Sequence, residues 1–369
     1  MLHLSYCTNV HPAEDLAGIL AQFDTYAVAV RRELAADVLG LGLWLPAPAA
    51  AELAADAGLR RRLRRELDVR GLEVVTLNGF PHRAFHAPVV KHAVYHPDWT
   101  SRQRLTYTLD LARVLADLLP DGAARGSVST LPLAWRLPWD HARADAARRH
   151  LDELARGLDD LAAATGRPVR VGFEPEPGCV VENTAQAAAL LSGIDTRWLG
   201  VCLDLAHLAV AWEEPAAALD RLRAAGLPVV KVQLSAALEA ADPAAAAEAL
   251  RAYVEPRFLH QTRSSLGVAA DDLDQALGER LPGPWRVHYH VPLHAAPAAP
   301  LTSTMPLLRA AVRELLAGPE PACDHFDVET YTWDVLPPEQ RPRDAAALAR
   351  GIAAELAVAR SLLPAEVSR

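Results

Sequence analysis

Two apolar segments of the sequence end in side chains that can bind a cation or move a proton. Apolar residues alternate along 169–176, so Glu174 and Glu176 fall on the same face of an extended chain, at its carboxyl end. A second segment ends at Asp204, which alternation places opposite the apolar side chains, and His207 follows three residues later. Carboxylates and an imidazole in these positions predict metal binding or acid–base chemistry.

Two further segments carry polar groups with the same alternation. One contains Lys231 and Gln233, and the other, near the C-terminus, contains His325, Asp327 and Glu329. If these segments are strands of one sheet, their polar groups face a common cavity. Unpaired buried charges cost several kcal/mol each, so they are normally neutralised, hydrogen bonded or coordinated. A bound divalent cation meets that requirement.

We therefore predict a divalent metal ion, Mn2+, Mg2+, Co2+ or Zn2+, and the abundance of carboxylates favours the harder ions. His288 and His290 share one face of another extended segment, and they either complete a site for several cations or bind substrate. Glu174 and Glu176 are equivalent by spacing, so the sequence does not choose between them. The predicted metal ligands are Glu174, Glu176, Asp204, His207, Gln233, His288, His290 and Glu329.

Such a site predicts proton transfer on an α-hydroxy carbonyl compound. A cation with open positions polarises the substrate oxygens and stabilises the enediolate. Glu329 and either Glu174 or Glu176 would move the proton. Lys231 either polarises the carbonyl group or forms an internal ion pair with one of these acids. The predicted catalytic residues are Glu174, Glu329, Lys231 and His207.

The elements that must position these residues alternate between short β-rich runs and longer helical stretches, a pattern typical of βα units around a parallel sheet. We predict an α/β fold, a (β/α)8 TIM barrel. Strands are predicted at residues 2–8, 37–45, 72–77, 126–131, 169–173, 199–203, 229–234, 286–291 and 324–329. Helices are predicted at 13–35, 50–69, 101–118, 141–165, 184–193, 215–225, 243–253, 304–317 and 343–363.

Nine predicted strands compete for eight places in the barrel. We expect 286–291 to belong to an excursion between the seventh and eighth barrel strands. The longest non-periodic segments follow strands, where barrel enzymes carry their active-site loops. The prediction is one TIM-barrel domain, residues 1–369, with insertions near 78–100 and 236–303 and long loops on the C-terminal face of the barrel.

Composition excludes several classes of protein. The 369 residues are 51% hydrophobic, enough for a large core. A net charge of −9 argues against electrostatic binding to the phosphate backbone of nucleic acids, so no nucleic-acid partner is predicted. The four cysteines form no CxxC pair, which fits a reducing compartment. Without a signal-peptide pattern or a long apolar run, the prediction is a cytoplasmic protein.

The strings GFEPEP (172–177) and GVCLDLAH (200–207), with Gln233 and Glu329, resemble the xylose-isomerase-like TIM-barrel superfamily. That superfamily includes sugar phosphate isomerases and epimerases and the endonuclease IV type of DNA repair enzyme. The resemblance implies a metal centre with His207 as ligand or substrate contact. Gln233 stands where many relatives have His, and the His288/His290 group would compensate. The implied metal ligands are Glu174, Asp204, Gln233 or a neighbouring His, and Glu329.

Rarer strings are similar to the EboE metabolite traffic protein family, among them YCTNVHP (6–12), LNGFP (77–81), FLHQT (258–262), HVPLH (290–294) and VETYTWDVLP (328–337). This resemblance implies a role in processing or exporting a secondary-metabolite precursor. The implied partners are a small-molecule metabolite and membrane or prenyltransferase-like proteins of the same pathway. Residues predicted to bind substrate are Asn9, His11, Asn78, Lys91, His260, His294 and Trp333.

Three functional hypotheses follow. The first is a metal-dependent, sugar isomerase- or epimerase-like enzyme acting on a small polar metabolite. The second is a non-catalytic metabolite-binding or scaffold protein that keeps the metal pocket. The third is an endonuclease IV-like phosphoesterase, against which the acidic charge counts.

Overall fold

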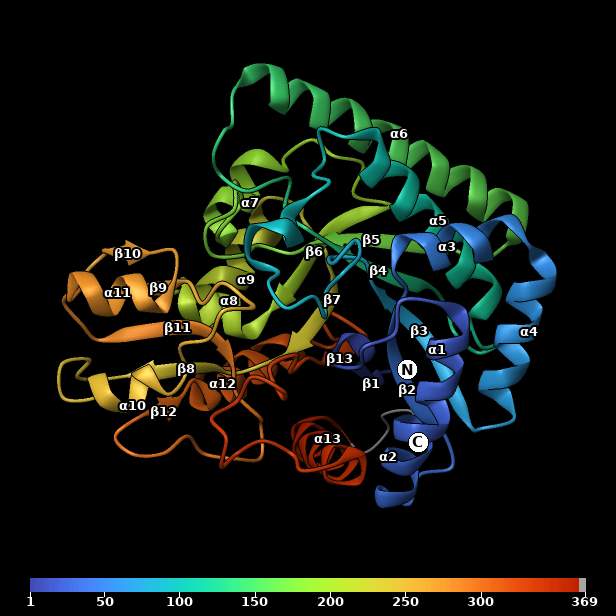
Figure 1. Ribbon diagram of the computed structural model, residues 1–369. Helices are drawn as coiled ribbons and strands as arrows, with labels where there is room; N and C mark the ends of the chain where they lie inside the picture. The colour runs from blue at the N-terminus through green and yellow to red at the C-terminus, as the bar shows by residue number, and fades with distance from the viewer. Residues whose placement is uncertain (365–369) are drawn as a thin grey trace.

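A closed ring of parallel strands forms the centre of the protein, in a computed structural model that describes residues 1–364. The strand order is β1-β13-β7-β6-β5-β4-β3-β2, and β1 closes the ring by pairing with both β2 and β13. This confirms the predicted α/β class and (β/α)8 barrel (Figure 1). The barrel strands are β1 (His3–Cys7), β2 (Leu39–Trp44), β3 (Leu72–Asn78), β4 (Gly126–Thr130), β5 (Val169–Phe173), β6 (Leu199–Asp204), β7 (Val229–Leu234) and β13 (His325–Val328).

Alternation along the strands separates an apolar outer face from a polar interior. On β13, Phe326 and Val328 join the hydrophobic core, whereas the Nδ1 atom of His325 lies 2.8 Å from the Ser127 hydroxyl across the barrel. Side chains at strand ends that continue this inward phase point into the mouth of the barrel. The outward and inward directions predicted for the side chains of this strand thus agree with the structure.

Helices surround the ring of strands (Figure 1). α5 packs against α3, α4 and α6, and α13 packs against α2. The helices of this layer are α1 (Leu16–Gln22), η2 (Phe23–Ala27), α2 (Val28–Glu33), α3 (Ala47–Ala55), α4 (Ala57–Asp68), α5 (Arg102–Leu118), α6 (His141–Thr165), α7 (Thr184–Leu190), α8 (Leu205–Val210), α9 (Pro215–Ala224), α12 (Met305–Leu316) and α13 (Ala345–Leu362). Two short helices, η1 (Thr8–Val10) and η3 (Lys91–Tyr95), lie in the loops after β1 and β3.

The helix predicted at 50–69 was wrong in one respect, because the chain forms two helices there. Asp56 separates α3 from α4, and its carboxylate accepts hydrogen bonds from the backbone N–H groups of Gly58 (2.6 Å) and Leu59 (3.2 Å). An aspartate in this position satisfies the free N–H groups of a new first turn. The local cap outweighs the continuous helical period of the sequence.

A second, antiparallel sheet lies in the segment between β7 and α12. Its strand order is β10-β9-β11-β8-β12, and in Figure 1 this yellow-to-orange segment lies to the left of the barrel. The expected excursion at 286–291 is confirmed, since it corresponds to β11 of this sheet. The elements are β8 (Ala237–Ala240), α10 (Ala247–Arg251), β9 (Thr262–Ser264), β10 (Ala269–Ala270), α11 (Leu273–Glu279), β11 (Trp285–His290) and β12 (Thr302–Ser303).

β11 brings polar groups from this sheet to the barrel. Trp285, Val287 and Tyr289 are buried in the hydrophobic core. His288 and His290 alternate with them, and β11 packs against α8, which begins at the end of barrel strand β6. The two-residue period of a strand therefore delivers both imidazoles to the same side.

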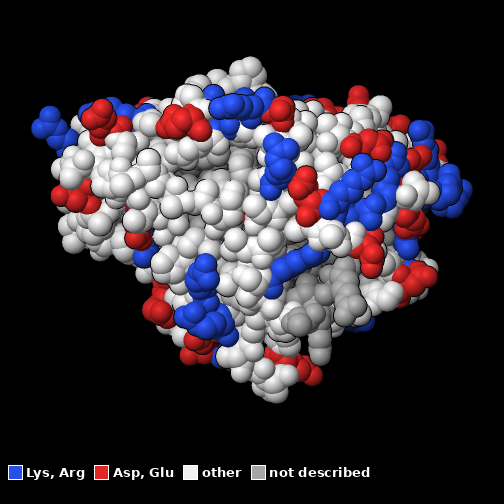
Figure 2. Space-filling view, turned by 90° about the horizontal axis from the view of Figure 1, so that it is seen from below, with Lys and Arg blue, Asp and Glu red and all other residues white. Residues whose placement is uncertain are grey.

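The surface carries charges of both signs. On the face shown in Figure 2, Lys and Arg side chains are interspersed with Asp and Glu. None of the helices in residues 1–364 combines the length and apolar character that a bilayer crossing requires.

Candidate active site

Three acidic side chains converge on one amide nitrogen at the mouth of the barrel. Glu174 follows β5, Asp204 ends β6 and Glu329 follows β13. The Nε2 atom of Gln233, on β7, lies 3.1 Å from Glu174 Oε1 and 3.2 Å from Asp204 Oδ2, and it also contacts Glu329 Oε2. A primary amide has two N–H donors, so Gln233 cannot satisfy three carboxyl groups at once. The cluster needs a further positive partner.

Burial makes this cluster difficult to ionise. Burial, followed by repulsion from Glu329 and Asp204, raises the pKa of Glu174 well above its usual value. Burial and the charge of Asp204 raise the pKa of Glu329 to about 8. Burial also opposes the charge of Asp204, but the nearby His207 and His290 and a backbone N–H group lower its pKa. The surroundings thus favour the anion of Asp204 and the protonated forms of Glu174 and Glu329.

Neighbouring side chains hold Glu329 in place. The side-chain amides of Asn9, after β1, and Asn78, at the end of β3, both donate to Glu329 Oε1 at 2.8 Å. Both amides line the pocket, as predicted for substrate-binding residues, but in this structure their N–H groups orient a carboxylate. Fixed orientation is what a catalytic or metal-binding carboxylate requires.

Asp204 is held by the turn that follows β6. Its Oδ1 atom accepts hydrogen bonds from the backbone N–H of His207 (2.9 Å) and from the hydroxyl of Ser235 (2.8 Å). Asp204 is therefore the N-cap of α8, and the same turn places the His207 ring in the lining of the pocket. The Asp-x-x-His spacing in the sequence reflects this turn.

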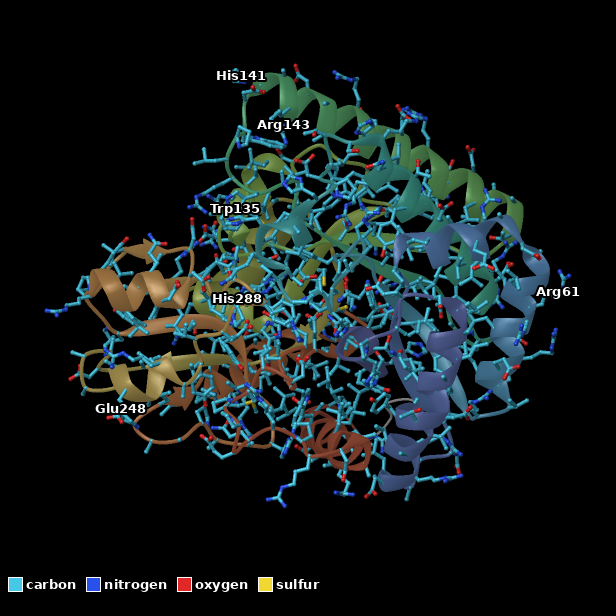
Figure 3. All side chains as sticks on the ribbon, viewed as in Figure 1. Arg61, Trp135, His141, Arg143, Glu248 and His288 are labelled. Atoms are coloured by element: carbon cyan, nitrogen blue, oxygen red, sulfur yellow. The ribbon has the colours of Figure 1, made fainter. Side chains whose placement is uncertain are left out.

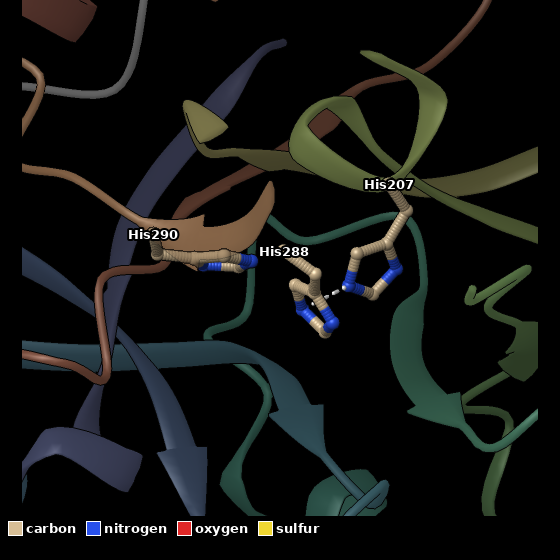
Figure 4. Close-up of side chains that lie close together, drawn as sticks. All are labelled: His207, His288 and His290. Atoms are coloured by element: carbon tan, nitrogen blue, oxygen red, sulfur yellow. Dashed lines mark hydrogen bonds between the residues drawn. The ribbon is translucent and has the colours of Figure 1, made fainter. Parts of the chain in front are cut away.

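Three histidine rings meet beside the acids, one from α8 and two from β11 (Figure 4). The Nε2 atoms of His207 and His288 lie 2.9 Å apart, and His290 Nε2 lies 4.0 Å from Asp204 Oδ2. Burial lowers the pKa of all three rings, that of His207 to about 4. All three imidazoles are therefore neutral at physiological pH, the form that binds metals.

The residues present fit a divalent cation. Three overlapping groups of buried side chains have ligand atoms within 4.8 Å of one another: Glu174, Asp204 and His207; Asp204, His290 and Glu329; and His207, His288 and His290. Among the described residues, Glu174 Oε2 and His290 Nε2 are buried without a hydrogen-bond partner. Unpaired buried acceptors beside crowded carboxylates are the donor set that a cation satisfies.

Glu176, the alternative to Glu174, lies elsewhere in the same pocket. Its Oε1 atom accepts a hydrogen bond from the Tyr95 hydroxyl at 2.7 Å, and it belongs to none of the three ligand groups. Burial raises the pKa of Glu176 to about 8. The geometry thus favours Glu174 as the ligand and leaves Glu176 as a carboxyl group facing the pocket.

Lys231 lies below the site and not in it. The side chain is completely buried, does not line the pocket, and forms an ion pair with Asp327, with Nζ and Oδ2 2.8 Å apart. Of its two expected roles the structure favours the ion pair, but with Asp327 and not with Glu174, Glu176 or Glu329. The reason is position, since Lys231 precedes Gln233 by one inward step along β7 and so occupies a deeper layer of the barrel.

A pocket with about 510 Å3 of empty space opens above the cluster. Its floor carries the acids and histidines, and its walls are mainly apolar, including Phe80, Phe85, Phe258 and Tyr331. Figure 3 shows that His288 lies in the interior, where the second sheet meets the barrel, whereas Arg61 and Glu248 lie at the periphery. Polar groups grouped at one end of an apolar pocket are typical of a small-molecule site.

Among the residues predicted to bind substrate, Lys91 also lines the pocket, where it forms an ion pair with Asp272. His11 does not line it. The ring of His11 stacks on Tyr26 with ring centroids 4.0 Å apart, and its Nε2 atom lies 3.2 Å from the Tyr6 hydroxyl. The structure thus places His11 in packing contacts behind β1, and its role in substrate binding stays a prediction.

His260, His294 and Trp333 are also absent from the pocket lining. His260 is fully buried between Glu255 and the backbone carbonyl of His288, with both contacts at 2.9 Å. His294 is exposed and stacks on Trp333, whose indole N–H donates to Glu355 at 3.2 Å. The side chains of all three thus contact other protein groups, and their roles in substrate binding stay predictions.

Sequence reasoning missed several residues that complete the site. Tyr95 and Gln261 link Glu176 to His288, since Gln261 Nε2 donates to the Tyr95 hydroxyl and Gln261 Oε1 lies 2.7 Å from His288 Nδ1. Tyr331 lines the wall beside His290. These residues stand in loops or at strand edges without periodic spacing, so no pattern in the sequence marks them.

Comparison with known proteins agrees with the barrel fold. The model of a family described as xylose isomerase-like TIM barrel matches residues 32–262. A xylose isomerase-like TIM barrel protein from Mycobacterium smegmatis, solved in complex with magnesium, is 15% identical over 99% of this chain and 98% of that one, with a TM-score of 0.55. D-allulose 3-epimerase from Methylomonas sp. is 12% identical over 98% of both chains, with a TM-score of 0.54. No curated protein sequence matches significantly.

Proposed function

Because the chain belongs to the xylose isomerase-like TIM barrel family, we propose that it is a metal-dependent isomerase or epimerase of a small, polar α-hydroxy carbonyl metabolite. One observation carries the proposal: Glu174, Asp204 and Glu329 all contact the Nε2 atom of Gln233, and Glu174 and Glu329 also line the pocket. Two carboxyl groups with raised pKa values thus lie beside Asp204, whose pKa is lowered.

Glu174, Asp204 and Glu329 would hold the cation, together with the side-chain oxygen of Gln233. Among the described residues that oxygen accepts from the Cys202 thiol, at 3.3 Å, while the amide nitrogen faces the acids. The amide would therefore have to turn over to offer its oxygen to the cation. When bound, the ion polarises the carbonyl and hydroxyl oxygens of the substrate and thereby acidifies the neighbouring C–H bond. The oxygen-rich donor set favours Mg2+ or Mn2+.

Glu174 and Glu329 would carry out the proton transfer. One carboxylate removes the proton from the carbon next to the carbonyl group, and the other, in its acid form, returns a proton to the enediolate. Epimerisation results when the proton returns to the same carbon from the opposite face, and isomerisation when it returns to the neighbouring carbon. Burial raises the pKa of Glu329 to about 8 and that of Glu174 well above its usual value, which favours the acid form that returns the proton.

The remaining groups would bind and orient the substrate. His207 and His288 present neutral imidazoles to the pocket, and Glu176 presents a carboxyl group that can hydrogen bond with a sugar hydroxyl. The apolar walls exclude water from the reacting carbon. The structural neighbours include an epimerase and a protein solved with magnesium, which supports this proposal.

The test measures proton abstraction directly. The protein is incubated in D2O with Mn2+ or Mg2+ and a panel of ketoses and ketose phosphates, and 1H NMR follows loss of the signal next to the carbonyl group. We expect exchange of one proton in at least one compound. In Glu329→Gln the exchange rate should fall by about 100-fold or more. Glu66→Gln, on the outer face of α4, is the matched control and should exchange like the parent.

Exchange that persists in Glu329→Gln would overturn the assignment of this residue. Absence of exchange across the panel, with tight binding of one of the compounds, would favour the second hypothesis of a non-catalytic metabolite-binding or scaffold protein. The endonuclease IV-like alternative requires a basic surface for DNA, which the net charge of −9 does not favour. A role in metabolite traffic, with membrane or prenyltransferase-like partners, stays a prediction from the sequence resemblance.

A further inference from the structure

The three histidine rings of the pocket lie close together. One ring nitrogen of each of His207, His288 and His290 lies within 4.8 Å of the other two, and the Nε2 atoms of His207 and His288 are 2.9 Å apart. Two nitrogen atoms this close need a proton or a cation between them, because their lone pairs otherwise repel. The hydrogen bonds of the Nδ1 atoms, on the opposite side of each ring, decide whether a proton or a cation lies between the two Nε2 atoms.

Each Nδ1 atom faces an oxygen that can only accept. His207 Nδ1 lies 2.9 Å from the carbonyl oxygen of Pro175, and His290 Nδ1 lies 2.8 Å from that of Glu329. A backbone carbonyl has no proton to give, so both rings carry their proton on Nδ1. In a neutral imidazole the Nε2 atom is then a bare acceptor.

His288 has the same arrangement through a side chain. Its Nδ1 atom lies 2.7 Å from Gln261 Oε1, while Gln261 Nε2 donates to the Tyr95 hydroxyl at 2.8 Å. The Tyr95 hydroxyl in turn donates to Glu176 at 2.7 Å. This chain fixes the Gln261 oxygen toward His288, so His288 also keeps its proton on Nδ1 and presents a bare Nε2.

We infer that His207, His288 and His290 form a second cation site, rich in nitrogen, beside the oxygen-rich acidic cluster. Three imidazole ligands suit Zn2+ or another borderline divalent ion, unlike the carboxylate set. An N–H donated to a carbonyl or amide oxygen is the usual support of a metal-binding histidine. His290 Nε2, which is fully buried and has no partner among the described residues, is the ligand atom that this site explains.

Asp204 connects the two sites. Its Oδ1 atom lies 3.9 Å from His207 Nε2, and its Oδ2 atom lies 4.0 Å from His290 Nε2 and 3.2 Å from Gln233 Nε2. One carboxylate that faces both ligand sets can bridge two cations, as in two-metal enzymes. The inference deepens the proposed function and rests on it for the cation at the acidic cluster. It also gives the inserted sheet a part in the site, because His288 and His290 lie on β11.

The test counts ions rather than turnover. His288 is the variant of choice because it belongs to the histidine group alone, whereas His290 also reaches the acidic cluster. Parent, His288→Leu, Glu329→Gln and the control His141→Leu, an exposed residue at the start of α6, are loaded with Zn2+, freed of excess ion and measured by plasma mass spectrometry. We expect two, one, one and two ions, respectively.

A second measurement uses Co2+ in place of Zn2+. A site of three imidazoles gives the strong visible absorption of low-coordinate cobalt, and a six-coordinate oxygen site gives only a weak one. The strong band should persist in Glu329→Gln and disappear in His288→Leu. Thermal unfolding of each variant shows that it is folded, and His288→Gln replaces His288→Leu if the latter is not.

Each outcome separates this inference from the proposed function. One ion in both parent and His288→Leu would overturn the histidine site and leave the proposed function intact. One ion that is lost in His288→Leu and kept in Glu329→Gln would support the histidine site and overturn the acidic one. No ion in the parent would overturn both, and a proton between His207 and His288, visible by 15N NMR, would then account for their approach.

Discussion

The Nε2 atoms of His207 and His288 lie 2.9 Å apart, although each ring directs its Nδ1 atom at an oxygen acceptor on the far side. The two residues come from different parts of the fold, one from the first turn after a barrel strand and the other from the inserted sheet. Their contact makes the insertion a component of the pocket.

The first prediction concerns the oxygen that orients His288. Gln261→Leu removes the acceptor for the Nδ1 proton, so the ring can rotate and its Nε2 atom is no longer held as a ligand. We expect Zn2+ affinity at the histidine site to fall about 10–100-fold, measured by competition with a chromogenic chelator. Gln103→Leu, on the exposed face of α5, should bind Zn2+ like the parent. Equal affinities in both variants would show that Gln261 does not support the ring.

The second prediction concerns the ion pair beneath the site. Lys231 and Asp327 are completely buried, so Lys231→Met leaves the Asp327 charge without its partner. We expect the free energy of unfolding to fall by about 3–5 kcal/mol, measured by denaturant titration. The exposed pair of Arg223 and Asp220 provides the control, since Arg223→Met should cost about 1 kcal/mol or less. A similar small loss in Lys231→Met would contradict the proposed burial of the pair.

The third prediction concerns the close approach of β2 to the same carboxylate. A Cβ atom on Gly42 would lie 2.1 Å from Asp327 Oδ2 and 2.3 Å from Oδ1. Asp327 cannot move aside easily, because Ser5 and Lys231 hold it. Gly42→Ala should therefore destabilise the protein by about 1–3 kcal/mol, seen as a lower thermal midpoint.

Gly122→Ala is the matched control for this overpacking, because no atom lies within 4 Å of the added Cβ. Its thermal midpoint should equal or slightly exceed that of the parent. An unchanged thermal midpoint in Gly42→Ala would contradict the close approach of Gly42 to the Asp327 carboxylate.

The fourth prediction is a pH dependence of stability that comes from Glu355 on α13. Its carboxyl group accepts hydrogen bonds from Thr330 (2.6 Å), Leu293 (3.0 Å) and Trp333 (3.2 Å), and burial raises its pKa to about 7 from an ordinary 4.5. The folded protein thus holds this proton more tightly than the unfolded chain. The resulting stabilisation is complete below about pH 4.5 and is lost as the pH rises through about 7.

Glu355→Gln removes this titration and keeps the shape of the side chain. Between pH 5 and pH 8 the parent should lose up to roughly 3 kcal/mol of unfolding free energy more than the variant, measured by denaturant titration at each pH. Other buried acids titrate in both proteins and cancel in the difference. Parallel pH profiles would show that Glu355 does not exchange its proton in this range.

Much of the acidic cluster could be predicted from the sequence, because it depends on local periodicity. Two-residue alternation assigned an inward direction to Glu174, Asp204, Gln233 and Glu329. In a closed barrel, inward side chains at the carboxyl ends of the strands meet at the mouth of the barrel. The choice between Glu174 and Glu176 was not local. It depends on Tyr95, from the loop after β3, which hydrogen bonds with Glu176.

By itself, then, the sequence determined the ring of strands, the excursion at β11 and the inward direction of the acids, because each follows from spacing within a few residues. Only the tertiary structure decided that Lys231 pairs with Asp327, that His11 and His260 serve packing, and that His288 meets His207. These contacts join residues up to 96 positions apart, as for Lys231 and Asp327. Partner choice over such separations depends on how layers and loops pack, and no periodicity in the chain encodes it.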